Sequence, residues 1–283
     1  MTGLDYRDGA YRSAPRRPSL LARVFPAPAL YAPFLWIVLR ASSRAKRGRY
    51  GDAEWMDSSL GCIRALERVG VRFEITGTGN LGQGPCVVVA NHMSALETVA
   101  LPAILLPFGR VTFIVKQSLL TYPVFGHIMR SRDPIGVTRT QPREDLKAVF
   151  EGGPERLARG ISIIVFPQTT RTHVFDPPQF TSIGAKLAQR AGVPLVPLAL
   201  KTDAWGNGRY LKDFGPVDPS RAVRFAFGER IPVQTRGSGE HQQVVAYISG
   251  KLEEWGREER RAAAAGADAS GQAGSPQPEA GDG

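Results

Sequence analysis

The residues best suited to chemistry lie in the segment Asn91-His92-Met93-Ser94-Ala95-Leu96-Glu97. The segment follows an uninterrupted apolar run, residues 86–90, which predicts a fully buried strand. It precedes a second apolar stretch, residues 98–106, that is long enough for a short helix. Polar side chains at the exit of a buried strand stand where open α/β sheets usually bind ligands.

The spacing of His92 and Glu97 restricts how the two side chains can meet. On a continuous helix, five residues would turn them roughly 140° apart. They can meet only if His92 lies on the strand–helix connection and Glu97 in the first helical turn. There the carboxylate can fix one imidazole nitrogen, leaving the other free to take a proton from a hydroxyl. Because no serine completes a triad here, the nucleophile would be an alcohol of the substrate.

The same segment has a structural interpretation. Ser94 and Glu97 fit a capping box, with Ser94 as the N-cap and Glu97 at the third helical position. Capping and catalysis do not exclude each other, so both interpretations remain open at this point.

The positive charge of the chain is concentrated at its N-terminus. The formal net charge is +10, and residues 1–50 hold ten basic and two acidic residues, which amounts to +8. A local basic block indicates a polyanionic partner, either nucleic acid or an anionic bilayer.

An apolar segment inside this block favours the bilayer. Residues 24–39 are uncharged and mostly apolar, contain three prolines, and are shorter than the ~20 residues needed to cross a membrane. Flanking bases, with Tyr31 and Trp36 inside the segment, are typical of a stretch that lies in the membrane interface. Ordinary core packing is the alternative, and a cleaved signal peptide is disfavoured by the prolines and the lack of a clear cleavage site. With Cys62 and Cys86 as the two cysteines, no disulfide framework is expected, and a reducing cytosolic compartment fits.

Strand and helix patterns alternate through most of the chain. Strands are predicted over 71–76, 86–90, 111–115, 134–137, 161–166 and 196–200, and helices over 52–69, 98–106, 118–129, 143–157 and 182–191. An edge strand over 223–227 and a closing helix over 244–255 follow. The alternation predicts an α/β fold with a mixed, largely parallel central sheet flanked by helices, preceded by the N-terminal membrane-interface helical segment. The expected organisation is a disordered basic stretch (1–20), the interface segment (21–50), one domain (51–261) and a disordered tail (262–283).

Four strand ends carry His92, Lys116, Arg139 and Arg171. Parallel strands would bring these ends to one edge of the sheet, around a single crevice. Two guanidinium groups and an ammonium group indicate a phosphate ligand, and the histidine indicates a hydroxyl beside it. Each cation alone is better explained as a solvated surface charge, so the prediction depends on their recurrence at strand ends.

The order of four motifs resembles that of the glycerolipid acyltransferases, which include the 1-acylglycerol-3-phosphate acyltransferases. Asn91-His92-x4-Glu97 resembles the family's Asn-His-x4-Asp, and Ile135–Arg139 resembles its second motif, a short strand ending in arginine. Phe166–Arg171 resembles Phe-Pro-Glu-Gly-Thr-Arg, and Val193–Leu198 resembles the fourth motif, Val-Pro-Leu/Val-Val-Pro-Val/Leu. The segment that begins at Lys116 resembles the region between the first two motifs. Together these cover roughly residues 50–230 of the sequence.

The resemblance implies an O-acyltransferase with defined residue roles. His92 would be the general base that deprotonates a lysophospholipid hydroxyl, and Glu97 would orient it. The acyl donor would be acyl-CoA or acyl-carrier protein, with no cofactor and no metal, and the leading product would be phosphatidate. The residues implied in substrate binding are Arg139, Arg171, Lys116, Gln168, Thr169 and Thr170.

The sequence departs from the family's pattern at three places. Glu97 replaces the usual aspartate, Gln168-Thr169 replaces Glu-Gly, and Thr138 stands where an aspartate is common. Two acidic groups are thereby expected to be missing near the phosphate, which leaves open a different lysolipid acceptor or a non-catalytic lipid-binding protein on the same fold. The expected partners are an anionic membrane surface, the acceptor and the donor, and no nucleic acid, because the basic block lacks interleaved aromatic residues. The expected location is the cytoplasmic face of the cell membrane, as a peripheral or monotopic protein.

Overall fold

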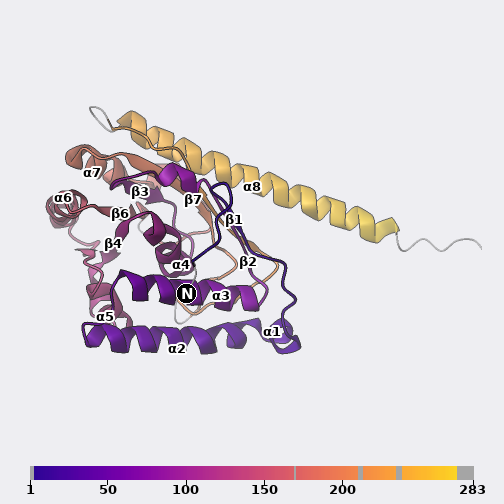
Figure 1. Cartoon of the computed structure of the whole chain (residues 1–283). Helices are drawn as coiled ribbons and strands as arrows, with labels where there is room; N and C mark the ends of the chain where they lie inside the picture. The colour runs from indigo at the N-terminus through magenta and orange to yellow at the C-terminus, as the bar shows by residue number, and fades with distance from the viewer. Residues whose placement is uncertain (1–2, 169, 210–212, 234–237, 273–283) are drawn as a thin grey trace, which may run out of the picture.

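The computed structural model describes residues 3–168, 170–209, 213–233 and 238–272. They form three layers, with helices on both faces of one eight-stranded sheet (Figure 1). The strands are β1 (Tyr11–Arg12), β2 (Arg72–Thr76), β3 (Val87–Ala90), β4 (Arg110–Lys116), β5 (Ile135–Val137), β6 (Ile161–Val165), β7 (Leu195–Lys201) and β8 (Ala222–Phe227). The helices are α1 (Leu20–Val24), α2 (Pro26–Lys46), α3 (Asp52–Arg68), α4 (Leu96–Leu105), α5 (Phe125–Arg130), α6 (Pro142–Ala158), α7 (Ile183–Ala191) and α8 (Ser238–Gln272).

The sheet is mixed and parallel in its middle, as the sequence predicts. Its strand order is β1-β2-β8-β7-β3-β6-β4-β5. Strand β3 pairs in parallel with β7 and β6, and β4 pairs in parallel with β6 and β5. The ends of β3, β4, β5, β6 and β7 therefore reach the same edge of the sheet, where the predicted site residues lie.

Strand β3 shows why the centre of the sheet is uniformly apolar. Val88 and Ala90 belong to the core shared with α2, α3 and α4, whereas Val87 and Val89 belong to the core shared with α6, α7 and α8. Successive side chains of a strand point to opposite faces. A strand covered by helices on both faces must therefore be apolar at every position.

Three sequence predictions about the edges and ends of the chain are wrong. Strand β8 is interior, because it pairs with β2 on one side and β7 on the other. Residues 3–20 are ordered: β1 pairs antiparallel with β2, and the hydroxyls of Tyr11 and Ser13 donate to the buried Glu67 carboxylate at 2.6 and 2.5 Å. The predicted disordered tail instead continues α8 as far as Gln272, while residues 273–283 lie outside the described residues.

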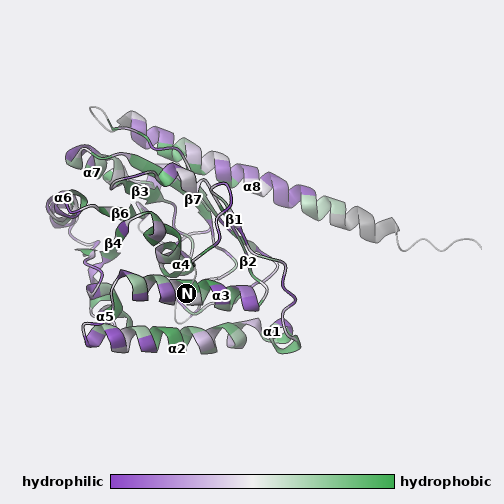
Figure 2. Ribbon diagram, viewed as in Figure 1, coloured by the Kyte–Doolittle hydropathy of each residue, from purple (hydrophilic) through white to green (hydrophobic). Residues whose placement is uncertain are grey.

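Helices α1 and α2 form the outermost element on one side of the molecule, with α3 between α2 and the sheet (Figure 1). The prolines do not interrupt α2. Pro26 and Pro28 lie in its first turn, where the backbone N–H groups have no helical partner, and Pro33 lies inside a continuous helix. Large apolar side chains are exposed along α1 and α2, and Figure 2 shows the hydrophobic colouring of both helices. They are Leu20, Leu21, Val24, Phe25, Leu35, Trp36 and Leu39. Within the described part of the chain, no helix has both the length and the apolar character to cross a bilayer.

The predicted helix over 118–129 is divided in two. A short 3-10 turn, Gln117–Leu120, is followed by α5, and Val124 between them has a φ of 67°. Pro123 accounts for this break. Proline has no backbone N–H, so it cannot donate the hydrogen bond that would continue a helix from the preceding turn. The remaining predicted elements are present with ends shifted by a residue or two, except that the closing helix predicted over 244–255 extends from Ser238 to Gln272.

Candidate active site

His92 and Glu97 meet at the carboxyl end of β3. His92 lies on the connection two residues past the strand, and Glu97 lies in the first turn of α4. The imidazole Nδ1 is 3.6 Å from Glu97 Oε2, slightly beyond hydrogen-bond length. Such pairs are often loose without substrate and tighten in the complex. This contact assigns Nδ1 to the carboxylate and leaves Nε2 as the nitrogen for a substrate proton.

The Glu97 carboxylate both accepts hydrogen bonds from the loop and faces His92. Oε1 accepts hydrogen bonds from the backbone N–H of Met93 (2.6 Å) and Ser94 (2.9 Å) and from the Thr202 hydroxyl (2.8 Å), while Oε2 faces His92 and also accepts from the Ser94 N–H at 3.0 Å. Burial opposes ionisation of Glu97, but His92 and these backbone donors outweigh it, so its pKa is lowered. Helix α4 begins at Leu96 with Ala95 as its N-cap, so the predicted capping box with Ser94 as the N-cap forms only in part. Glu97 accepts from the N–H of Ser94, whereas Ser94 Oγ accepts from the N–H of Leu96.

A first prediction concerns the pH dependence of stability. Because the folded-state pKa of Glu97 is depressed, its stabilising contribution is complete above the unfolded value, ~4.3. That contribution is lost as pH falls below this value toward the folded pKa. Glu97→Gln is therefore expected to lower the free energy of unfolding at pH 7 by about 1–3 kcal/mol, because backbone donors lose a charged acceptor. In urea unfolding experiments, the difference in stability between variant and wild type should shrink as pH falls below about 4.3. A difference that stays constant over this range would contradict a lowered pKa of Glu97 in the folded state.

The backbone and ring of His92 are held by the loop that follows β6. The N–H of His92 donates to Gln168 Oε1 at 2.7 Å, and the N–H of Thr172 donates to the carbonyl oxygen of His92 at 3.0 Å. The imidazole stacks on Phe166, with ring centroids 4.3 Å apart and planes at 19°. The motif after β6 therefore fixes the histidine from three sides.

This geometry explains why glutamine can stand where the family has glutamate. The observed contact needs only an acceptor oxygen for a backbone N–H, and an amide provides one as a carboxylate does. The replacement of glutamate by Gln168 therefore keeps the hydrogen bond to the backbone N–H of His92. It places Gln168, which is buried, beside His92 rather than on the surface of an acceptor site.

A second prediction follows for Gln168. Gln168→Glu is expected to keep kcat within about threefold of the wild type, because the acceptor oxygen is retained. Gln168→Ala should lower kcat by about tenfold, since it leaves the buried N–H of His92 unsatisfied and frees the loop. Steady-state acyl transfer by the two variants measures both effects. Equal activity of Gln168→Ala and wild type would show that the loop does not position the base.

Arg139 and Arg171 lie close enough to affect each other. Desolvation and then repulsion from Arg171 lower the pKa of Arg139, and Asp145 partly opposes this shift. Arg171 is held by an ion pair with Asp213 at 2.5 Å. Two neighbouring guanidinium groups at the end of β5 and after β6 form the cationic part of the site.

Two carboxylates enter this region from outside the family motifs, which corrects the expectation that acidic groups are missing there. Asp213 pairs with Arg171. Asp145, in the first turn of α6, accepts hydrogen bonds from the backbone N–H of Thr138 (2.6 Å) and of Arg139 (2.7 Å). Arg139 has a left-handed backbone, with φ of 65°, which is uncommon for a residue other than glycine. Asp145 therefore stabilises the loop conformation that presents Arg139.

The other predicted binding residues are less directly placed. Lys116 is exposed at the end of β4, where it is in register with Val137, two residues before Arg139. Thr170 is exposed on the loop between Gln168 and Arg171. Thr169 lies outside the described residues.

Several residues that build the site were given no role of their own in the sequence analysis. Asn91 bridges β3 and β7 through two hydrogen bonds with Leu200, at 2.8 and 2.9 Å. Thr202 follows the end of β7, so the strand-end rule that selected His92 would also have selected it. Asp145 could have been noticed as an acid in the first turn of a helix directly after a strand. Asp213 gives no such signal, because it lies between structural elements.

Comparisons with known proteins agree with this fold. Residues 72–201 match the family model described as Acyltransferase. The chain is 28% identical over 209 residues to the 1-acyl-sn-glycerol-3-phosphate acyltransferase of Pseudomonas aeruginosa, covering 74% of this chain and 76% of that protein. It is 33% identical over 138 residues to a probable enzyme of the same name from Mycoplasma pneumoniae, covering 46% and 50%. The crystal structure of the 1-acyl-sn-glycerophosphate acyltransferase PlsC from Thermotoga maritima has the same fold, with a TM-score of 0.58 at 23% identity over 82% of this chain and 97% of that one.

The matched residues contain both the His92–Glu97 pair and the two arginines, so the part of the chain that carries the candidate site is similar to the Acyltransferase family. More specifically, it is similar to the glycerolipid acyltransferases of the 1-acylglycerol-3-phosphate type.

Proposed function

We propose that the protein transfers a fatty acyl group from acyl-CoA or acyl-carrier protein to a hydroxyl of a lysophospholipid. The leading acceptor is 1-acylglycerol-3-phosphate, and the product is then phosphatidate. The observation that carries this proposal is the shared sheet edge, on which a carboxylate-supported imidazole and two neighbouring guanidinium groups lie within one set of connected loops. The names of the similar proteins from Pseudomonas and Mycoplasma support the same acceptor.

The reaction that fits this site is a direct displacement at a thioester. Nε2 of His92 takes the proton of the acceptor hydroxyl as its oxygen attacks the thioester carbonyl carbon. An ester C–O bond forms, the C–S bond breaks, and the departing thiolate takes the proton from the imidazolium. Glu97 stabilises the transient positive charge on His92, because its carboxylate remains ionised. The balance of atoms and electrons requires no cofactor, so we propose that none is used.

Arg139 and Arg171 would hold the acceptor's phosphate beside this base. A phosphate accepts parallel hydrogen bonds from guanidinium groups, and its charge would relieve the repulsion between the two arginines. Lys116, Gln168, Thr169 and Thr170 were also implied in substrate binding. Of these, Gln168 is better placed to position His92.

We further propose that the protein works as a peripheral or monotopic protein on an anionic membrane, at its cytoplasmic face. The exposed apolar side chains of α1 and α2, among them Trp36, together with the basic N-terminal region, support this placement. Nucleic acid is not among the proposed partners.

The decisive experiment offers the purified protein a panel of lysolipids. Palmitoyl-CoA and palmitoyl-acyl-carrier protein serve as separate donors, and mass spectrometry identifies the products. Phosphatidate from 1-acylglycerol-3-phosphate supports the proposal. A different acylated lysolipid would reassign the acceptor, and the absence of thioester-dependent product with every acceptor would refute catalysis by this chain.

A further inference from the structure

A basic groove lies between α2 and α3, away from the catalytic loops. Its volume is about 310 Å³, which is within the range of small-ligand sites, about 300–1,000 Å³. Its lining contains four arginines and one carboxylate, a net charge of +3. The lining residues that carry the argument are Trp36, Arg40, Arg44, Asp57, Arg64 and Arg68.

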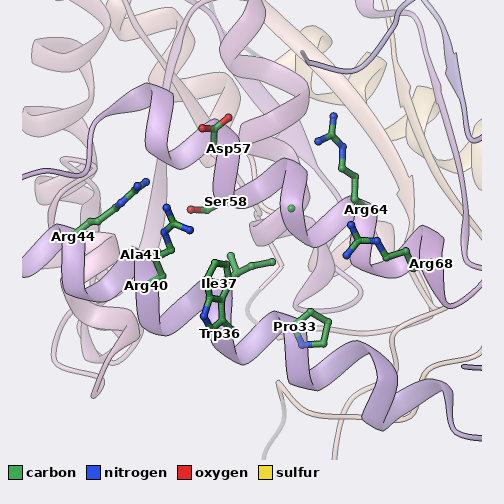
Figure 3. A pocket seen from close by; sticks show the side chains of 11 residues that line it. Pro33, Trp36, Ile37, Arg40, Ala41, Arg44, Asp57, Ser58, Arg64 and Arg68 are labelled. Atoms are coloured by element: carbon green, nitrogen blue, oxygen red, sulfur yellow. The ribbon is translucent and has the colours of Figure 1, made fainter. Parts of the chain in front are cut away.

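The arginines come from two helices that lie at different depths. Arg40 and Arg44 belong to α2, whereas Arg64 and Arg68 belong to α3, which packs between α2 and the sheet (Figures 1 and 3). A bilayer that contacts the outer face of α2 would not lie flat against arginines of the inner helix. A group that projects from the bilayer into the groove would meet arginines from both helices.

Trp36 connects this groove to the apolar outer face. Its side chain lines the groove, is 59% exposed, and lies under the guanidinium of Arg40 at 5.1 Å from the ring centroid. Leu35 and Leu39, on the same helix, are also exposed. Tryptophan prefers the headgroup level of a membrane. The arginines beside it are therefore at the level of lipid phosphates when the apolar face is inserted.

We propose that the α2–α3 groove binds the phosphate of an anionic phospholipid in the bilayer. Guanidinium groups from two helices would hold the phosphate by paired hydrogen bonds. The acyl chains would lie along the exposed apolar row of α2. The site is separate from the acceptor site at Arg139 and Arg171, and it rests on the membrane association in the proposed function but not on catalysis.

The test separates a built phosphate site from diffuse attraction between a basic protein and an anionic surface. Binding of the full chain is measured by co-sedimentation with vesicles of phosphatidylcholine that contain 30 mol% phosphatidylglycerol (about a third), and with phosphatidylcholine alone. Tryptophan fluorescence gives a second measurement of vesicle binding. Trp36 is exposed whereas Trp55, Trp205 and Trp255 are buried, so a change in emission on adding vesicles reports on Trp36. Arg64→Lys/Arg68→Lys keeps the charge but loses the guanidinium fork, so it is expected to weaken binding to anionic vesicles about fivefold. Arg64→Ala/Arg68→Ala should weaken it by more than about tenfold.

The matched control changes two arginines outside the groove in the same way. Arg23→Lys/Arg47→Lys alters exposed residues of α1 and of the end of α2, and should bind anionic vesicles within about twofold of the wild type. Binding to phosphatidylcholine alone should be the same for all variants. Far-UV circular dichroism verifies folding, which the surface position of these arginines favours.

Wild-type affinity in Arg64→Lys/Arg68→Lys would overturn the inference and leave the membrane association intact. Lack of vesicle binding by the wild type would overturn both the phosphate site in the groove and the proposed membrane association. Binding of duplex DNA with the same dependence on Arg64 and Arg68, without binding of vesicles, would assign the groove to a nucleic acid instead. His92→Ala is expected to bind vesicles like the wild type, so a failure of the catalytic proposal is recognised independently.

Discussion

Replacing His92 with alanine is expected to lower kcat for acyl transfer about 10³-fold, because a positioned general base contributes ~10²–10⁴-fold. The acceptor hydroxyl has a high pKa, and the imidazole Nε2 is the group that the Glu97 contact leaves available for its proton. The KM for both substrates should change little, since His92 contacts the reacting atoms rather than the phosphate. Steady-state transfer of labelled palmitate to lysophosphatidate measures the effect.

The control for this experiment is a histidine that the site does not use. His127 lies on α5 with its Nδ1 at 2.8 Å from Arg130, and His127→Ala should retain turnover within about twofold. The two variants should have the same thermal unfolding midpoint within a few degrees (about 2–4 °C). Turnover by His92→Ala within tenfold of the wild type, roughly 1.4 kcal/mol in the barrier, would exclude its role as the base.

Arg171→Ala is expected to raise the KM for lysophosphatidate about 10–100-fold, because hydrogen bonds to charged groups contribute ~1.5–3 kcal/mol. The kcat should fall less, since the phosphate takes no part in the bonds that form and break. Arg171→Lys should recover only part of the loss, because an ammonium group cannot make two parallel hydrogen bonds. Kinetics with lysophosphatidate and with monoacylglycerol, which lacks the phosphate, isolate the effect. An equal change for both acceptors would show that Arg171 does not bind the phosphate.

The partner of Arg171 gives a prediction of opposite sign. Asp213 Oδ1 pairs with Nη1 of Arg171 at 2.5 Å, so it would compete with the acceptor's phosphate for that nitrogen. Asp213→Asn is expected to lower the KM for lysophosphatidate about threefold, because partly exposed ion pairs contribute ~0–1 kcal/mol. Asp203→Asn is a comparison outside the site, since Asp203 pairs with Lys201 and Arg221. A higher KM in Asp213→Asn would indicate that the pair orients Arg171 for the phosphate.

The central part of the fold follows from local sequence patterns. Residues 86–90 have the uniform apolar character of a strand covered on both faces, and β3 has that environment. The error at β8 has a physical origin, because Val223-Arg224-Phe225 alternates like an edge strand although the strand is interior. Arg224 is accommodated there by ion pairs with Glu74 and Glu258, at 3.0 and 2.7 Å. A charged residue with partners from neighbouring elements cannot be distinguished from a solvated one by its pattern.

The site was predictable where the chemistry is local and unpredictable where it depends on distant segments. His92 and Glu97 lie five residues apart, so their meeting could be deduced from one strand–helix connection. The acceptor role of Gln168 depends on the proximity of two loops 76 residues apart. Asp213 likewise reaches Arg171 across 42 residues. The motif resemblance implied that Gln168 binds the substrate. The pairing of β3 with β6 instead places Gln168 where it accepts a hydrogen bond from the backbone N–H of His92.

The pairing of β1 with β2 has a practical consequence for shortened versions of the protein. Removing the first twenty residues would remove the hydrogen bonds that the hydroxyls of Tyr11 and Ser13 donate to the Glu67 carboxylate. It would also expose the backbone N–H and C=O groups of β2 that pair with β1, and these could then pair with the same strand of another molecule. Removing these residues in order to improve crystals would therefore favour aggregation, and a chain that keeps them is the better starting material for purification.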